Sequence, residues 1–377
     1  MNWPLYRLET EPLLATDGNR GLWYNRFFNQ YTSEWVIIPE DRKNNIEEGR
    51  HHWVNENAKN PVDQQAVQQA VLQASAIRHL TLITALGGRG AVFATDWHFA
   101  SGLGLPHPVE NGLAWHHTLG VPYLAGSGVK GLVKAWVEVW DESLNEEEKK
   151  RRSMDWFGTT EQAGRFLFFD ALPVEPVKLT ADVMTPHMAK WYEQGGEIND
   201  WQREPEKVPA DWQAPVPVPF LVVKSTKLLF GVTPRCPKFA GELPEVFAAL
   251  KQSLDWLGAG AKTAAGYGRM MEHEAATADL QERAKQAKAK VEEAKLSPEQ
   301  RALRKLRSRL EADQERGFKE AGGELIGQTN QLLKDGLAWQ PADQVELAML
   351  AEAIFSYIGW GAKKKERKEK IAALRSA

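Results

Sequence analysis

The 377-residue sequence contains a single cysteine, Cys236. One thiol cannot form an internal disulfide, and it excludes a zinc site built from several thiolates. The sequence also lacks any run of about eighteen apolar residues, and its first residues, MNWPLYRLETEPLL, contain no apolar stretch of the signal-peptide type. We therefore expect a soluble, cytoplasmic protein in a reducing compartment, without membrane contact.

The sequence has no excess of basic residues either. Its 47 lysines and arginines are balanced by 50 aspartates and glutamates, which gives a net charge of −3. Because binding to nucleic-acid phosphates needs concentrated positive charge, any such surface must be local. Hydrophobic residues make up 43% of the chain and aromatic residues 10%, with 15 tryptophans, so the composition is that of a folded protein with a substantial core.

Composition divides the chain into three parts. Residues 1–75 combine an aromatic cluster, NRGLWYNRFFNQY at 19–31, with the start of a helix, and we expect both to pack on the core. That helix is expected from Asn60 as its cap and Pro61 as its first residue up to about residue 86. Residues 76–273 mix strand and helix patterns, with an insertion rich in proline, glycine and charge at about 182–219. Residues 274–377 are charged and alanine-rich, which predicts a helical extension.

The middle part has an order of elements typical of an α+β domain. Alternating β-branched and aromatic residues predict a strand in AVFATDWHFASGLG, starting at residue 91. A helix is expected from about residue 129 to 140, one or two strands within 164–187, another strand within 219–234, and a helix within 243–258. These elements occur in β-α-β-β-α-β proportion.

A glycine-rich turn precedes the first of these helices in the sequence GSGVKGLVKAW, residues 126–136. Gly126, Ser127 and Gly128 would let a ligand approach the backbone, and the positive end of the helix favours an anion. Lys130 and Lys134 are one helical turn apart, so both ammonium groups can reach one chain of phosphates. The same two lysines are also ordinary residues for a solvated helix face, and the sequence alone leaves both interpretations open.

A second glycine-rich loop, GAGAKTAAGYGRM at 258–270, has a similar character. Lys262, Thr263 and Arg269 supply cations and a hydroxyl for phosphates, and Tyr267 supplies an aromatic face on which a base could stack. A tight turn beside a strand would explain the glycines but not the charged residues among them. Neither loop has the glycine-lysine-serine/threonine order of an ATP-binding Walker A motif, so the sequence gives no support for nucleotide hydrolysis.

These loops belong to a longer set of motifs. GLGLPHPVENGLAWHHTLGVPYLAGSGVKG at 102–131, DVMTPH at 182–187 and GAGAKTAAGYGRM occur in the same order in the repeat-associated (RAMP) superfamily of CRISPR proteins, which this sequence resembles. Within the superfamily it is similar to the family of the sixth-numbered subunit of type III-B Cmr effector complexes. The resemblance covers roughly residues 76–273 and gives no function to the helical extension.

The resemblance implies a ferredoxin-like, RRM-related fold with a projecting hairpin insertion. It also implies a non-catalytic subunit that binds the 3′ part of the guide crRNA and caps the backbone of the complex in antiviral RNA-guided defence. Its partners would be the guide crRNA, the paired target RNA, and the backbone and small subunits of the Cmr complex. No cofactor and no metal are expected.

The resemblance assigns RNA contacts to three segments. Met184 and His187 in the insertion would wedge against the guide–target duplex. Because base pairing supplies sequence specificity in such complexes, cationic loops without a base-reading code are physically sufficient. The remaining residues, which would contact the guide backbone, are Gly126, Ser127, Gly128, Lys130, Lys134, Lys262, Thr263 and Arg269.

Two adjacent histidines, His116 and His117, raise the alternative of a metal-independent endoribonuclease with a histidine as general acid or base. Adjacent residues in an extended segment point opposite ways, so at most one of them faces a given site. We favour a hydrogen-bonding role for the pair beside the RNA. The set of His98, His107, His116 and Cys236 lacks the close paired spacing of zinc ligands.

Overall fold

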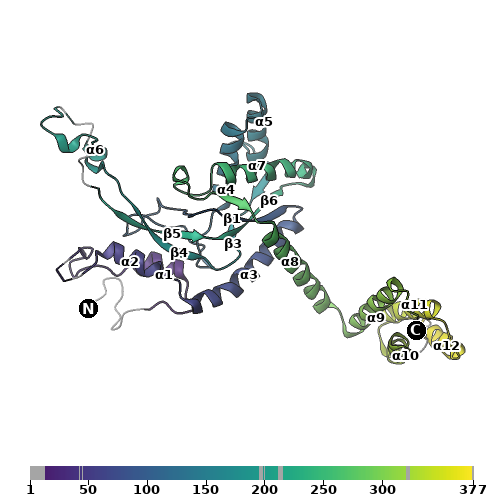
Figure 1. The fold of residues 1–377 in the computed structure, drawn as a ribbon. Helices are drawn as coiled ribbons and strands as arrows, with labels where there is room; N and C mark the ends of the chain where they lie inside the picture. The colour runs from purple at the N-terminus through teal and green to yellow at the C-terminus, as the bar shows by residue number, and fades with distance from the viewer. Residues whose placement is uncertain are drawn as a thin grey trace. The chain divides into compact units, whose positions relative to one another are not determined.

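The computed structural model describes residues 13–41, 43–44, 46–194, 198, 200–210, 215–319 and 323–375. The chain forms two compact units, Met1–Ala284 and Lys285–Ala377. The division falls inside a long helix, α8 (Glu274–Lys295), which begins where the change in composition predicts a boundary. Each unit is described by itself below, with its elements labelled in Figure 1.

An antiparallel sheet forms the centre of the first unit. Its strands follow the order β2-β6-β1-β7, and a short strand, β3, pairs with β6 beside β2. In the register of the central pair, Val92 lies opposite Leu229. The strands are β1 (Arg89–Thr95), β2 (Phe166–Phe168), β3 (Leu172–Pro173), β6 (Lys227–Pro234) and β7 (Met270–Glu272).

Both faces of this sheet are covered by helices (Figure 1). On one face, Phe93 of β1 contacts Phe230 of β6 and Phe247 of α7, with ring centroids 5.3 and 6.3 Å apart. On the other face, Val92 packs in a separate cluster with Leu80 of α3. Side chains of neighbouring strand residues point to opposite faces, so a strand buried on both faces is apolar throughout. The helices are α3 (Val62–Ala85) on the second face, and α4 (Gly126–Ala135) and α7 (Leu243–Trp256) on the first.

Two predicted elements have different limits in the structure. The apolar stretch 219–234, expected as one strand, contains two: β5 (Val218–Ser225) and β6, separated at Thr226. The helix expected over 129–140 begins earlier, at Gly126, and its last turn is the π-helix η1 (Trp136–Trp140). The helix expected within 243–258 is confirmed as α7.

The strand β5 lies outside the central sheet and pairs with β4 (Lys178–Met184) in a two-stranded ribbon, from Lys178 opposite Ser225 to Met184 opposite Val218. The helix α6 (Ala189–Gln194) lies at the far end of this ribbon (Figure 1). The segment 164–187, expected to hold one or two strands, thus holds three. The helix α5 (Glu146–Phe157) is not among the predicted elements, although Asn145 and Glu148 form the capping box that marks its start.

Within the first unit, the N-terminal part packs on the core through α1 (Arg20–Arg26) and α2 (Gly49–Asn57). The Tyr24 ring stacks on His107 with centroids 4.3 Å apart, and burial lowers the pKa of this histidine. Burial also lowers the pKa of Arg20 to about 10, while its guanidinium donates to the carbonyl of Asn57 at 2.7 Å.

The expected role of Asn60 as the cap of α3 is wrong. The N-cap residue is Pro61, which has no side chain able to accept a helix amide. The Asn60 side chain instead accepts from the amide of Leu179 in β4 and donates to the carbonyl of the same residue, each at 2.9 Å. Asn60 therefore ties the start of α3 to the two-stranded ribbon.

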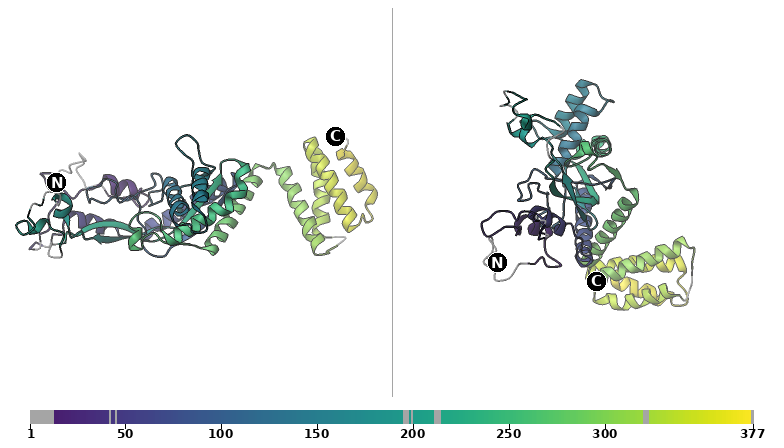
Figure 2. Two further views of the ribbon diagram at one scale, coloured as in Figure 1. Left: turned by 90° about the horizontal axis from the view of Figure 1, so that it is seen from above. Right: turned by 60° about the vertical axis from the view of Figure 1, so that its left-hand side comes forward.

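The second unit is a bundle of helices (Figure 2), which confirms the helical character predicted for this extension. Ser297 and Gln300 form a capping box at its first helix. Leucines of α9, α10, α11 and α12 share one core, in which Leu306 and Leu347 are buried. Among the described residues, none of the helices is both long and apolar enough to cross a membrane. The helices are α9 (Pro298–Glu315), α10 (Glu324–Asp335), α11 (Pro341–Ile358) and α12 (Lys364–Arg375).

Candidate nucleic-acid interface

The start of α4 is held by the protein itself. The amide of Gly126 donates to Asp170 Oδ1 at 2.6 Å, and the N-cap residue, Ala125, has no side chain that could accept a bond. A Cβ atom at Gly126 would lie 2.3 Å from the carbonyl oxygen of Phe168, so glycine is required for packing against the end of β2. The expectation that Gly126 presents its amide to a phosphate is therefore wrong, because a carboxylate already fills that place.

The next turns of α4 have an open face. Ser127 and Gly128 are exposed, and Lys130 is partly exposed. A Cβ atom at Gly131 would meet nothing within 4 Å. A bare backbone of this kind, next to a lysine, can be approached closely by a ribose-phosphate chain.

The two lysines of α4 differ in their electrostatic surroundings. The Lys134 ammonium lies 3.6 Å from the Glu138 carboxylate, one turn further along, with both side chains about two-fifths exposed. In the part of the chain that the structure describes, no ion pair involves Lys130. The positive charge of Lys130 is thus more available to a phosphate, whereas that of Lys134 is partly compensated in a solvent-screened pair.

The second glycine-rich loop is shaped by contacts within the fold. A Cβ atom at Gly260 would lie 2.1 Å from the carbonyl oxygen of Ala100, and one at Gly268 would lie 1.9 Å from that of Ala259. Both glycines also have left-handed backbones, with φ of +92° and +72°. The tight turn therefore accounts for these two glycines, in agreement with the interpretation of the loop as a tight turn beside a strand.

Lys262 adopts a left-handed backbone with φ of +57°, which is unusual for a residue with a side chain. Its ammonium lies 5.3 Å from the centroid of the Phe220 ring and 5.9 Å from that of Tyr267. Thr263 follows as the first residue of a 3₁₀ turn, η5 (Thr263–Ala265). The loop thus holds one ammonium group against aromatic rings at a partly exposed position.

Tyr267 does not offer a stacking face. Its side chain is only 4% exposed, and its hydroxyl donates to the Asp182 carboxylate of β4. Burial raises the pKa of Tyr267, and the hydrogen bond and charge of Asp182 raise it further. The expectation that a base stacks on this ring is therefore wrong, and Tyr267 instead fastens the loop to the ribbon of β4 and β5.

Arg269 is engaged in ion pairs. Its guanidinium lies 2.8 Å from Asp255 and 3.6 Å from Asp96, and its Nε also donates to the Asp255 carbonyl. Two carboxylates compensate its charge, so the structure does not present Arg269 as a free cation for a phosphate. Its side chain is nevertheless half exposed, which keeps these pairs weak individually.

An exposed aromatic side chain beside this loop was not identified from the sequence. Trp97, just after β1, is 48% exposed, and its ring stacks on His98 at 4.5 Å with an interplanar angle of 13°. It also meets the edge of Tyr267, with centroids 4.9 Å apart. The only sequence signal was a tryptophan at the polar end of a predicted strand. Trp97 is thus an exposed aromatic ring beside this loop, the environment that was expected for Tyr267.

The two residues expected in the insertion lie at the end of β4. Met184 is the last paired residue and packs against a small cluster that includes Phe220 and Tyr267. His187 lies three residues beyond it and is exposed. Their expected contact with a guide–target duplex stays a prediction.

Both loops attach to the same short segment. The amide of Ala261 donates to the carbonyl of Ala100 at 2.7 Å, and the hydroxyl of the next residue, Ser101, donates to the carbonyl of Tyr123 at 2.7 Å. Tyr123 precedes the start of α4 by three residues. Two consecutive residues thus connect the second glycine loop to the approach to α4.

The two histidines have different environments. His116 is partly buried, and its Nδ1 accepts from the amide of Leu119 at 3.2 Å. Burial lowers the pKa of His116, and the nearby charge of Asp170 opposes this effect. His117 is exposed, and its carbonyl accepts from the Asn19 side chain at 2.7 Å. In the described part of the chain, no three histidine, cysteine, aspartate or glutamate side chains gather as a metal site.

Comparison with known proteins defines the class to which this fold and these loops belong. The model of the RAMP superfamily matches residues 79–271, which is more than half of the chain. The chain therefore belongs to the RAMP superfamily. The matched range includes β1, both glycine loops and the β4–β5 ribbon.

Two curated relatives are similar over shorter segments. One segment of 125 residues is 39% identical to the CRISPR system Cmr subunit Cmr6 of Pyrococcus furiosus, covering 31% of this chain and 33% of that protein. Another, of 83 residues, is 30% identical to the CRISPR system CMR subunit Cmr6 of Saccharolobus solfataricus, covering 22% of this chain and 27% of that protein. The chain thus spans about a third or less of the relatives that it matches.

Two solved structures are similar to the model at low sequence identity. A chain of the type III-B Cmr-beta complex bound to cognate target RNA is 16% identical, with a TM-score of 0.41, covering 68% of this chain and 86% of that chain. The crystal structure of Cmr6 from Pyrococcus furiosus is 23% identical, with a TM-score of 0.32, covering 49% of this chain and 98% of that one. Both TM-scores are below 0.5, which is too low to transfer residue positions.

Proposed function

We propose that this chain is a guide-RNA-binding subunit of a type III-B Cmr effector, which holds the 3′ part of the crRNA and caps the backbone of the complex. The main support for the proposal is the segment of 125 residues that is 39% identical to a Cmr6 subunit, in a chain that belongs to the RAMP superfamily. Its partners are then the guide crRNA, the paired target RNA and the backbone and small Cmr subunits. An assembly of this kind would work in the cytoplasm.

The strand order supports a more specific description of the fold. The order β2-β6-β1-β7, with α4 after β1 and α7 after β6, corresponds to a ferredoxin-like β-α-β-β-α-β domain. In this description β4, β5 and α6 form a hairpin insertion between the second and third strands of the domain. The insertion then leads away from the sheet beside the second glycine loop, to which Tyr267 fastens it.

The proposed RNA contacts follow from which groups remain available. Lys130 and the bare backbone at Gly131 would contact phosphates and riboses, and Lys262 would contribute a second cation. Trp97 would provide a stacking face. These groups recognise a ribose-phosphate chain and not a base sequence, which suits a subunit whose guide supplies the specificity. In this proposal, Gly126, Tyr267 and Arg269 position the loops without contacting RNA.

A single added methyl group tests the open face of α4. Gly131→Ala is expected to raise the free energy of unfolding by about 0.5–1 kcal/mol, because alanine favours the helix and nothing lies within 4 Å of the added Cβ. The same methyl group would hold an RNA backbone away, so we expect RNA affinity to fall on the order of fivefold, about 1 kcal/mol. Thermal unfolding and fluorescence anisotropy with labelled single-stranded RNA measure the two effects.

Gly327 provides the matched control. It lies in α10, is exposed and has nothing within 4 Å of a Cβ atom. Gly327→Ala should stabilise the second unit similarly and leave RNA affinity unchanged. If Gly131→Ala binds RNA as tightly as the natural sequence, RNA does not approach this face of α4.

We also propose that the chain does not cleave RNA. Incubation of the purified chain with end-labelled CRISPR repeat RNA in EDTA should give a retarded complex and no shortened product. His116→Ala and His117→Ala should leave this result unchanged. Specific cleavage that is lost in His116→Ala or in His117→Ala would establish the metal-independent endoribonuclease instead, with that histidine as its acid–base group. Absence of any retarded complex would contradict RNA binding by the isolated chain.

A further inference from the structure

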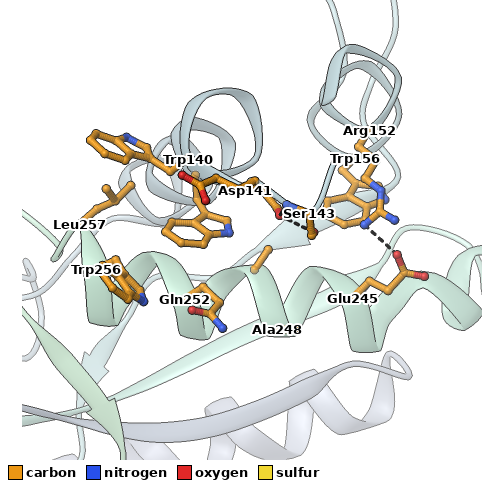
Figure 3. Close-up of a pocket in the computed structure, with 13 residues that line it drawn as sticks. Trp140, Asp141, Ser143, Arg152, Trp156, Glu245, Ala248, Gln252, Trp256 and Leu257 are labelled. Carbon is orange, nitrogen blue, oxygen red and sulfur yellow. Dashed lines mark hydrogen bonds and ion pairs between the residues drawn. The ribbon is translucent and has the colours of Figure 1, made fainter. Parts of the chain in front are cut away.

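A groove of about 800 Å³ lies between η1, α5 and α7, and none of the described residues that line it belongs to residues 126–131 or to the second glycine-rich loop, 258–270. Its walls come from η1, the segment 141–143 that follows it, the second half of α5 and the length of α7 (Figure 3). The π-helical turn η1 places Trp136 and Trp140 in the wall, and α7 ends there with Trp256. π-helical turns are rare and occur often at functional sites.

One end of the groove already holds an arginine of the chain. The Arg152 guanidinium lies 5.1 Å from the centroid of the Trp156 ring and 2.8 Å from Glu245 Oε2. The Trp156 ring is only 2% exposed, and its Nε1 donates to Glu242. This end therefore shows a guanidinium between an indole ring and a carboxylate, an arrangement that attracts a cation through both the ring and the charge.

The other end offers the same groups without a cation. Trp140 is 57% exposed and Trp256 is 74% exposed, which is unusual for the largest apolar side chains. Asp141 and Glu142 lie beside them in the lining, and Figure 3 shows Trp140, Asp141 and Trp256 at this end. Of the described residues that line the groove, Arg152 alone carries a positive charge, and Glu245 already pairs with it.

We propose that this end of the groove binds an arginine side chain presented by a segment of a partner protein. The guanidinium would stack on Trp140 or Trp256 and pair with Asp141 or Glu142, as Arg152 does with Trp156 and Glu245. A groove of about 800 Å³ exceeds the size of one side chain, so residues flanking the arginine also fit. The groove would thus be a protein-docking surface, and arginine binding there does not depend on the proposed RNA contacts.

The negative charge of the groove argues against a nucleic-acid base as its occupant. A base could stack on the two exposed indoles, but its phosphates would then lie near Asp141 and Glu142, and like charges repel. An arginine gains from the same carboxylates. The groove thus differs from the surface of α4 and the second glycine loop, where the available charged groups are lysines.

The test uses the full chain labelled with ¹⁵N-tryptophan and the blocked peptide acetyl-Gly-Gly-Arg-Gly-Gly-amide. The peptide should shift the indole signals of Trp140 and Trp256, which are assigned from single variants. The same peptide with citrulline, a neutral group of the same shape, should bind about tenfold more weakly because the cation–π and ionic attractions are lost. Trp256→Ala and Glu142→Gln should each weaken binding of the arginine peptide, the first by about tenfold.

Matched variants distinguish binding of the peptide at this site from a general attraction of the cationic peptide to acidic groups of the protein. Trp201→Ala removes another exposed tryptophan, and Glu161→Gln removes an exposed carboxylate elsewhere, so both should bind the peptide as the natural sequence does. Equal binding of the citrulline peptide, or full binding by Trp256→Ala, would overturn the proposal. So would oligoadenylate shifting the same indole signals, or a dimer in sedimentation that Trp256→Ala dissociates.

Discussion

Replacing Lys130 and Lys134 together by alanine is expected to weaken binding of single-stranded RNA by roughly tenfold, and equally for unrelated sequences. Each phosphate contact with a single strand contributes about 0.7 to the slope of log affinity against log salt. The slope should therefore fall by between about 0.7 and about 1.4, because Glu138 partly compensates the charge of Lys134. Anisotropy titrations at several salt concentrations with two unrelated RNAs measure both quantities.

The two single variants should differ in this experiment. The Lys134 ammonium is 3.6 Å from Glu138, whereas Lys130 has no ion pair in the described part of the chain, so Lys130→Ala should have the larger effect. Lys150→Ala combined with Arg151→Ala removes two exposed cations from α5 and serves as the control, with affinity expected to stay unchanged. If this control and the α4 pair weaken binding equally, RNA is attracted by overall charge and has no path along α4.

The sequence predicted the main elements of the central domain, because buried strands and helices place their apolar residues at regular intervals along the sequence. The alternation from residue 91 and the helical spacing within 243–258 correspond to β1 and α7. The division of 219–234 into two strands was not predicted, because both halves are apolar. The two strands differ only in their pairing partners, which are β4 for β5 and β1 for β6. The π-helical turn at Trp136–Trp140 likewise has no pattern of its own in the sequence.

The candidate site was predicted less well, because residue type does not show which partners a side chain already has. Arg269 and Lys262 look equivalent in the sequence, yet Arg269 lies between Asp255 and Asp96 while Lys262 lies against aromatic rings. Tyr267 was expected to be an exposed stacking face, but it is buried and donates a hydrogen bond to Asp182, whereas the exposed ring beside it is that of Trp97. These partners come from distant segments, so no local motif could identify them.

The second glycine loop allows a test of whether its glycines serve the fold or a ligand. Gly266 and Gly268 both have left-handed backbones, with φ of +91° and +72°, so an alanine at either position is strained by about 1–2 kcal/mol. They differ in space. A Cβ atom at Gly266 would meet only Trp97, at 3.9 Å, whereas one at Gly268 would lie 1.9 Å from the carbonyl oxygen of Ala259.

Gly268→Ala is therefore expected to lower the free energy of unfolding by more than about 3 kcal/mol, because overpacking adds to the strained backbone. Gly266→Ala should lower it by about 1 kcal/mol, since alanine also restricts the unfolded chain and offsets part of the strain. Urea unfolding followed by tryptophan fluorescence measures both values, because all tryptophans except Trp339 and Trp360 lie in the first unit.

The RNA affinity of the same two variants connects stability to function. The contact at Gly268 is internal, so the folded fraction of Gly268→Ala should bind RNA with almost the natural affinity. The affinity is measured under conditions that favour the native state and is corrected for the fraction of unfolded protein. Gly266 faces Trp97 and is exposed, so Gly266→Ala should reduce RNA affinity more than its small loss of stability explains. The opposite order, with Gly268→Ala specifically defective in binding and Gly266→Ala normal, would mean that RNA does not pass over Trp97 and the outer edge of this loop.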